Sequence, residues 1–238
     1  MPGPAYRRIL LKLSGEVLAG DQQFGIDPAM ASRLASEIQS IHKLNVKIGL
    51  IIGAGNIFRG IEAATKGMDR VTGDYLGMLA TIMNAISLQD ALENVGVETR
   101  TLSAITVSQI SEPYIRRRAL RHLDKNRVVI VAGGTGNPYF TTDTAAALRA
   151  TELKAEVLLK GTKVDGVYDK DPITNGDAIK YDEIKYSEIL NKNIRVMDLT
   201  AITLCKENSL PIQVFNINKS ENLKKIILGE SIGTMIKE

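Results

Sequence analysis

The sequence predicts an α/β fold: a three-layer αβα sandwich in which helices cover both faces of a mainly parallel central sheet. Short apolar runs alternate with stretches of helical periodicity along most of the 238 residues. This alternation is typical of parallel strands joined by helices. Three polar, glycine-rich loops follow predicted strands directly. Ligands of such sheets bind outside the carboxyl ends of the strands, so these loops also predict where a site lies.

Most of the predicted strands are short runs rich in Val, Ile or Leu. Strands are expected at residues 9–13, 47–52, 98–102, 127–132, 155–160 and 212–216. Helices are expected at residues 28–43, 73–94, 114–123, 144–153, 198–207 and 221–228. The first helix has the clearest start, because Asp27 can cap it and Pro28 suits the first helical position.

The pattern changes near residue 160. Residues 164–168 contain an Asp-Gly pair and predict a tight hairpin, and a polar stretch follows as far as Gly176. Neither a repeat nor a long linker is visible in the sequence. We therefore expect one domain over residues 1–238, with two lobes that meet near residue 160 and share one continuous sheet.

Composition excludes several classes of protein. The net charge is only +3, so neither nucleic acid nor an anionic membrane is a required partner. No apolar stretch approaches the ~18 residues of a membrane span, and Lys12 interrupts the apolar run near the N-terminus. Cys205 is the only cysteine and is expected to be buried, which excludes an internal disulfide and a CxxC zinc site. These features predict a reduced, cytoplasmic protein.

The loop after the first predicted strand contains Lys12, Leu13, Ser14 and Gly15. A lysine at a strand end can neutralise charge on a transferring phosphoryl group, while Ser14 and Gly15 offer hydroxyl and backbone donors. The alternative is a surface lysine before an ordinary turn.

The loop after the second predicted strand reads Gly-Ala-Gly-Asn-Ile-Phe-Arg-Gly over residues 53–60. Glycines let the backbone approach a phosphate closely, and the Arg59 guanidinium can form two parallel hydrogen bonds to one. The loop is not the dinucleotide fingerprint, because Phe58 stands where GxGxxG needs glycine, and the sequence lacks a Walker A loop. A purely structural turn is the alternative.

The third loop, residues 133–143, leads from a buried strand into a helix. Its backbone N–H groups and the helix dipole favour an anion. Asn137 and Thr141 or Thr142 are candidate ligand contacts, although Thr142 or Asp143 could equally cap the helix.

The fourth loop, residues 160–168 with Asp171, combines two lysines, an aromatic residue and a carboxylate, which suits a second nucleotide. A decorated hairpin is the alternative. Taken together, the four loops indicate phosphoryl transfer. This chemistry depends on positioning and charge neutralisation more than on a protein nucleophile.

In order along the chain, these loops resemble the bacterial uridylate kinases, a branch of the amino acid kinase family. The resemblance covers essentially the full chain. It rests on Lys12-Leu-Ser-Gly-Glu16, Asn56-Ile-Phe-Arg-Gly60, Asp74 with Gly77-Met-Leu-Ala-Thr81, Gly134-Thr-Gly-Asn-Pro138, Phe140-Thr-Thr-Asp143, Lys163-Val-Asp-Gly-Val167, Val196-Met-Asp-Leu199 and Leu210-Pro-Ile. It implies the amino acid kinase fold and the reaction UMP + ATP → UDP + ADP in pyrimidine nucleotide synthesis. Mg²⁺ is implied with ATP, without a direct protein ligand.

The resemblance also implies roles for individual residues. Lys12 and Arg59 are the expected catalytic residues. ATP contacts are expected at Lys12, Leu13, Ser14, Gly15, Gly55, Arg59, Thr162, Tyr168 and Asp171. UMP contacts are expected at Ala54, Asp74, Thr135, Gly136, Asn137, Pro138, Tyr139, Phe140, Thr141 and Thr142. Residues 1–160 would then form mainly the UMP lobe together with the Lys12 loop, and residues 161–238 mainly the ATP lobe.

Regulation and assembly follow from the same resemblance. It implies a homohexamer that is activated by GTP and inhibited by UTP. The GTP-response segment is expected at Gly20, Asp21, Gln22, Gln23, Phe24 and Gly25. Asp143 and Asp198 are weaker candidates, for helix capping, structure or water-mediated metal contact.

One residue departs from the pattern of the family. Ala54 stands where glycine is usual. A left-handed backbone would cost alanine roughly 1 kcal/mol or more, so we expect a φ at Ala54 that is not left-handed.

Two other functions stay open: a non-catalytic nucleotide-sensing or anion-storage protein on the same fold, and a kinase for another nucleoside monophosphate or for an acid.

Overall fold

The computed structural model describes residues 3–58 and 67–238. Its strands are β1 (Arg8–Leu13), β2 (Lys47–Ile52), β3 (Thr99–Ser103), β4 (Glu112–Pro113), β5 (Val128–Ala132), β6 (Val157–Thr162), β7 (Val167–Tyr168), β8 (Lys180–Tyr181), β9 (Glu183–Lys185), β10 (Ile212–Asn216) and β11 (Thr234–Lys237). Its helices are α1 (Glu16–Ala19), α2 (Pro28–His42), α4 (Arg70–Asn94), α5 (Arg116–Asp124), α6 (Thr142–Glu152), α7 (Tyr186–Asn191), α8 (Leu199–Glu207) and α9 (Asn222–Ile227).

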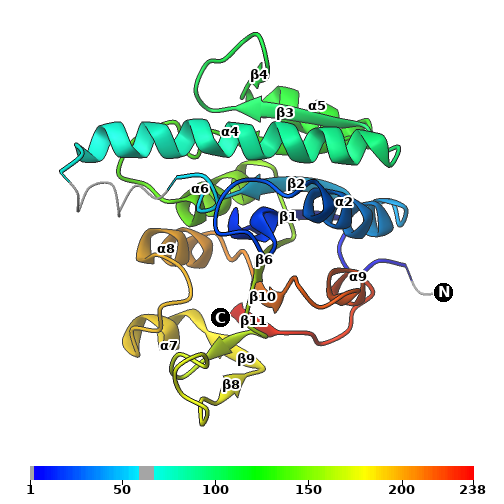
Figure 1. Cartoon of the computed structure of the whole chain (residues 1–238). Coiled ribbons are helices and arrows are strands. Elements are labelled where there is room, and N and C mark those ends of the chain that lie inside the picture. Colours follow the sequence, from blue (N-terminus) through cyan, green and yellow to red (C-terminus); the bar gives the residue numbers. More distant parts are fainter. Residues whose placement is uncertain (1–2, 59–66) are drawn as a thin grey trace.

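Nine of the described strands form one sheet in the order β4-β3-β5-β2-β1-β6-β10-β11-β9 (Figure 1). Every pairing described within it is parallel except β10 with β11, which confirms the predicted, mainly parallel sheet. Residue 160 lies in β6, and β6 is paired with β1 on one side and with β10 on the other. The sheet is therefore continuous across residue 160.

Helices cover both faces of the sheet, and side chains alternate between two cores because successive residues of a strand point to opposite faces. Ile9 and Leu11 of β1 pack with helices α2, α4 and α9. Leu10, between them, packs in the core under α5, α6, α7 and α8. All three side chains are fully or almost fully buried, and burying each contributes roughly 1.5–3 kcal/mol. The predicted three-layer sandwich is therefore present.

All of the long predicted elements are found, with shifts at their ends. Helix α4 begins at Arg70 rather than at residue 73, because the side chain of Asp69 caps it by accepting a hydrogen bond from the Thr72 N–H at 2.9 Å. The predicted cap of α2 is confirmed, since Asp27 accepts from the Ala29 N–H at 2.9 Å and Pro28 follows it. The sequence analysis did not predict the short elements α1, α7, β4, β8, β9 and β11.

The predicted tight hairpin at residues 164–168 is wrong. Strand β7 follows that pair but pairs with β8, so the loop of this hairpin spans residues 169–179 instead. A type I′ turn needs positive φ at both central residues, whereas neither Asp165 nor Gly166 has one. The Val167 N–H instead donates to the Thr234 hydroxyl at 2.8 Å, which ties this segment to β11.

Among the described helices, none has the length and apolar character that a membrane crossing requires.

Candidate active site

The register of two neighbouring strands brings two lysines together. Strands β1 and β6 pair in parallel, and Lys12 lies directly opposite Lys160. Like charges directly opposite each other on a sheet are destabilising, so this pair requires a counter-charge. The counter-charge is Asp143, in the first turn of α6.

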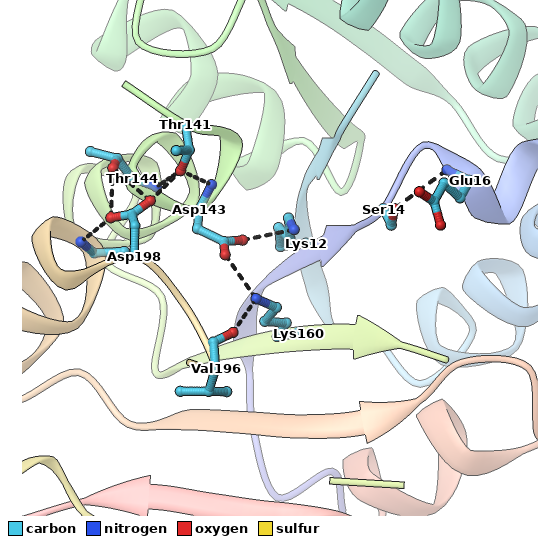
Figure 2. A network of polar contacts seen from close by, with 10 residues as sticks. Lys12, Ser14, Glu16, Thr141, Asp143, Thr144, Lys160, Val196 and Asp198 are labelled. Atoms are coloured by element: carbon cyan, nitrogen blue, oxygen red, sulfur yellow. Dashed lines mark hydrogen bonds and ion pairs between the residues drawn. The ribbon is translucent and has the colours of Figure 1, made fainter. Parts of the chain in front are cut away.

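Asp143 lies between the two ammonium groups (Figure 2). Its Oδ1 is 2.7 Å from Lys12 Nζ, and its Oδ2 accepts a hydrogen bond from Lys160 Nζ at 2.8 Å. The side chains of Lys12, Lys160 and Asp143 are only 12%, 11% and 16% exposed. We call these three residues the lysine–aspartate cluster; its net charge is +1 when all three groups are ionised.

Burial and charge act in opposite directions on this cluster. Burial alone would raise the pKa of the Asp143 carboxyl, but the ammonium groups of Lys12 and Lys160 outweigh it and hold that pKa below its ordinary value. Burial lowers the pKa of Lys160, the Asp143 carboxylate opposes that shift, and Lys12 adds to it. Asp143 is therefore ionised at neutral pH and does not act as a proton acceptor there.

A second carboxylate, Asp198, joins the N-termini of α6 and α8. It caps α8 by accepting from the Ala201 N–H at 2.8 Å, and it accepts from the hydroxyls of Thr144 and Thr141. The Thr141 hydroxyl also accepts from the Asp143 N–H, which makes Thr141, rather than Thr142 or Asp143, the cap of α6. The hydroxyl hydrogen of Thr141 is thus already donated, to the Asp198 carboxylate.

On one side of the lysine–aspartate cluster lies a cavity of about 540 Å³, which we call the α4-side cavity. One wall of it is a face of α4, whose residues recur at helical spacing. The cavity is lined by Glu16, Ala54, Gly55, Phe58, Arg70, Gly73, Asp74, Gly77, Met78, Thr81, Gly134, Thr135, Phe140, Thr141 and Thr142.

On the other side lies a cavity of about 640 Å³, which we call the β6-side cavity. Lys160 lines it directly. Asp143, which accepts a hydrogen bond from Lys160, follows Thr142 in the chain, and Thr142 lines the α4-side cavity. The lysine–aspartate cluster therefore connects the two cavities. The remaining lining residues are Thr162, Val164, residues 166–172, residues 192–196 and Val214.

The glycine loops that follow β1 and β2 pack tightly against each other. The Gly53 N–H donates to the Leu13 carbonyl at 2.9 Å, and a Cβ on Gly15 would lie 2.4 Å from the Gly53 carbonyl oxygen. Only glycine therefore fits at residue 15. Below the second loop, the buried amides of Asn56 and Asn84 hydrogen-bond each other, and Asn84 also donates to the Gly53 carbonyl at 2.7 Å.

Ala54 has a φ outside the left-handed region, as the sequence analysis predicted. The alanine is thus accommodated without backbone strain.

A sequence profile described as "Amino acid kinase family" matches residues 7–216. The chain belongs to the amino acid kinase family. The predicted resemblance and the predicted fold are confirmed.

Solved structures of family members are similar over nearly the whole chain. A UMP kinase from Bacillus anthracis is 39% identical with a TM-score of 0.94, and the match covers 98% of this chain and 96% of that chain. A UMP kinase from Ureaplasma parvum is 37% identical with a TM-score of 0.92 and is covered fully in both chains. A uridylate kinase from Archaeoglobus fulgidus is 30% identical with a TM-score of 0.75, covering 96% of this chain and 99% of that one.

The predicted site residues of this family member gather in three places. Of the predicted UMP contacts, Ala54, Asp74, Thr135, Phe140, Thr141 and Thr142 line the α4-side cavity. Gly136, Asn137, Pro138 and Tyr139 belong to the same loop but are not among the residues that line this cavity.

Of the predicted ATP contacts, Thr162, Tyr168 and Asp171 line the β6-side cavity. Gly55 lines the α4-side cavity, and residues 12–15 lie at the end of β1 beside the lysine–aspartate cluster. Arg59, predicted to be catalytic and to bind ATP, lies outside the described residues.

The predicted GTP-response segment, residues 20–25, is largely exposed, and its Phe24 is 68% exposed. Gly25, the last residue of this segment, is hydrogen-bonded to Asn56 in the second glycine loop. The Gly25 N–H donates to the Asn56 carbonyl at 2.7 Å, and the Asn56 amide donates to the Gly25 carbonyl at 2.8 Å.

Sequence reasoning missed three features of the site. Arg70 lines the α4-side cavity, and its spacing of four residues from Asp74 is a signal for an ion pair on one helix face. The pairing of Asp143 with both lysines required the strand register. Residues 192–196 carry no sequence signal for a ligand, since they line the β6-side cavity only because of the way α7 and α8 are joined.

Proposed function

We propose that this chain is a UMP kinase, which transfers the γ-phosphoryl group of ATP to UMP and thereby serves pyrimidine nucleotide synthesis. The observation that carries the proposal is the buried lysine–aspartate cluster between two cavities, in a chain that is 37–39% identical to two UMP kinases over 96–100% of their length. Cavities of this size suit ligands such as nucleotides.

We place UMP in the α4-side cavity and ATP in the β6-side cavity, so that the reacting phosphates meet near Lys12. The attacking oxygen of a nucleoside monophosphate is already ionised, so the reaction needs no protein base. It needs alignment and positive charge. The net charge of +1 on the lysine–aspartate cluster would attract the transferring group, and the backbone N–H of Ala54 would hold a phosphate oxygen.

Within this mechanism Lys12 bridges the transferring group, and Asp143 keeps both ammonium groups in place before the substrates arrive. Arg59 is proposed as a further phosphate contact from the second glycine loop. Asp74 would orient UMP through the ribose hydroxyls, since a carboxylate accepts hydrogen bonds from a diol.

Mg²⁺ is proposed as a companion of ATP, where it would neutralise phosphate charge. Among residues 3–58 and 67–238, no three His, Cys, Asp or Glu side chains are grouped so that they could hold a metal ion. Both carboxylate oxygens of Asp143 are engaged by lysines. This donor set fits an ion held mainly by phosphate oxygens and water, as Mg²⁺ usually is.

We further propose that copies of the chain assemble, as a homohexamer, through an exposed apolar stripe on α4. Tyr75, Leu79, Met83 and Ile86 recur at helical spacing and are 37–55% exposed. A row of large apolar side chains on a surface helix marks an association surface. Activation by GTP through residues 20–25, inhibition by UTP and residence in the cytoplasm are proposals that rest on the resemblance to uridylate kinases.

A coupled assay tests the proposed function. Purified protein with ATP and Mg²⁺ is offered UMP, CMP, dTMP or aspartate, with and without GTP. We expect ADP formation with UMP and UDP as the product. Nucleotide binding without ADP formation would instead favour the non-catalytic sensor, and preference for another acceptor would change the substrate.

A further inference from the structure

Tyr139 has a backbone conformation that a tyrosine rarely adopts. Its φ is 71°, in the left-handed region, and it follows Pro138 in the loop that leads to Phe140 and the α4-side cavity. This conformation costs a residue with a side chain roughly 1–2 kcal/mol. It persists only where the surroundings hold it, and such strain often accompanies a functional loop.

Two side chains of α4 hold Tyr139. Its N–H donates to Asp74 Oδ2 at 2.7 Å. The Arg70 Nε donates to both oxygens of Asp74, at 2.9 Å each, and the Arg70 guanidinium carbon lies 5.9 Å from the centre of the Tyr139 ring. Arg70 thus contacts the ring directly and reaches the backbone through Asp74. We call Arg70, Asp74 and Tyr139 the loop clamp.

A second contact from the same helix holds the start of the loop. The Gly133 N–H donates to the Thr81 hydroxyl at 2.9 Å, and this hydroxyl donates to the Met78 carbonyl at 2.6 Å. Asp74 and Thr81 are seven residues apart in sequence, so they lie on one face of α4 about 10 Å apart. The loop is therefore fixed to α4 at two points with the α4-side cavity between them.

We propose that Arg70 is a positioning residue for UMP. It orients the Asp74 carboxylate and keeps Tyr139 left-handed, which sets the shape of the loop and of the cavity before UMP binds. This inference rests on the proposed function. An arginine suits the role because its planar guanidinium contacts a carboxylate and an aromatic ring together, which a lysine ammonium does not.

The first test is steady-state kinetics of Arg70→Met and Arg70→Lys. For both variants we expect the KM for UMP to rise about tenfold, with kcat and the KM for ATP within about threefold of wild type. The matched control is Arg118→Met, which removes an arginine of similar exposure, 40% against 46%, paired with Glu112 on the surface. An unchanged KM for UMP in Arg70→Met, or a full rescue in Arg70→Lys, would overturn the proposal.

The second test is suppression. Glycine adopts the left-handed region freely, so it needs no clamp. We expect Tyr139→Gly to cancel most of the defect of Arg70→Met, so that the double variant has a KM for UMP within about threefold of Tyr139→Gly alone. Independent, multiplicative effects of the two changes would show that Arg70 does not act through Tyr139.

A third measurement separates this inference from the proposed function. Hydrogen exchange of the peptide covering residues 135–141 is followed without any nucleotide. We expect exchange about tenfold faster in Arg70→Met than in wild type or Arg118→Met, whereas equal exchange would refute the clamp. A wild-type protein that forms no UDP would refute the proposed function alone, since the exchange result still decides whether Arg70 holds the loop.

Discussion

Replacing Asp143 by asparagine tests whether the lysine–aspartate cluster is both structural and functional. The change keeps the size of the side chain and removes the charge between Lys12 and Lys160. Both ion pairs are short, at 2.7 and 2.8 Å, and little exposed. Removing one partner of a buried pair costs about 3–5 kcal/mol, and an asparagine oxygen still accepts a hydrogen bond, so we expect a loss of about 3 kcal/mol in unfolding free energy.

For a chain of this size such a loss lowers the Tm by roughly 6–12 °C, which thermal unfolding measures directly. The matched control is Asp124→Asn. Asp124 also faces two cations, Lys47 and Arg8, but its side chain is 60% exposed. Solvent screens that pair, so we expect a loss below about 1 kcal/mol.

The same variant has a predicted dependence on pH. The pKa of Asp143 is below its ordinary value in the folded protein. Asp143 therefore stabilises the fold above the unfolded pKa, near ~3.9, and that stabilisation is lost as the pH falls through the folded pKa. The stability gap between wild type and Asp143→Asn should be widest near neutral pH and should narrow below about pH 4.

Turnover completes this test. With both lysines no longer held, we expect kcat for UDP formation to fall by about 100-fold or more, the size of effect seen when one transition-state contact is lost. The pKa of Lys160 should also fall further without its counter-charge, so the alkaline limb of kcat should move to lower pH. A Tm and a kcat equal to those of Asp124→Asn would refute this account of the cluster.

Four further outcomes are expected. Lys12→Ala should lower kcat about 100-fold while calorimetry shows UMP binding nearly unchanged; near-normal turnover would remove Lys12 from the chemistry. Ala54→Gly should lower the unfolding free energy by up to about 1 kcal/mol, because φ at Ala54 is not left-handed; a stabilised variant would contradict that conformation. Cys205 should resist thiol reagents in the native protein at pH 8, because burial and then the charges of Asp143 and Asp198 raise its pKa to about 12; rapid labelling would contradict its burial. Met83→Lys should give a smaller species by light scattering if the α4 stripe joins subunits, and an unchanged mass would move the interface elsewhere.

Much of the fold could be predicted because its signals are local. Apolar runs such as Ile9 to Leu11 must be buried, and the alternation with helices leaves few arrangements besides a covered parallel sheet. The order of strands could not be predicted, since it depends on contacts between segments far apart in the chain. The Asp-Gly pair led to a wrong prediction of a tight hairpin, because Val167 is hydrogen-bonded to Thr234, a residue 67 positions away.

The candidate site divides in the same way. The glycine loops were recognisable because their composition and their position after strands are local properties. The lysine–aspartate cluster depends on the β1–β6 register, which sets Lys12 against Lys160, and the loop clamp depends on where α4 meets residues 133–140. Thr141 also shows a limit of motif reading, since its hydroxyl is used to cap α6 and to bond Asp198.

The most direct test of the central claim measures the products of one reaction mixture. The protein is incubated with ATP, Mg²⁺ and an equimolar mixture of UMP, CMP, dTMP and aspartate, and all products are separated by chromatography. The account predicts UDP and ADP in a one-to-one ratio, with the other acceptors left unphosphorylated until UMP is consumed. Binding of nucleotides with no ADP formed, or phosphorylation of another acceptor ahead of UMP, would contradict it.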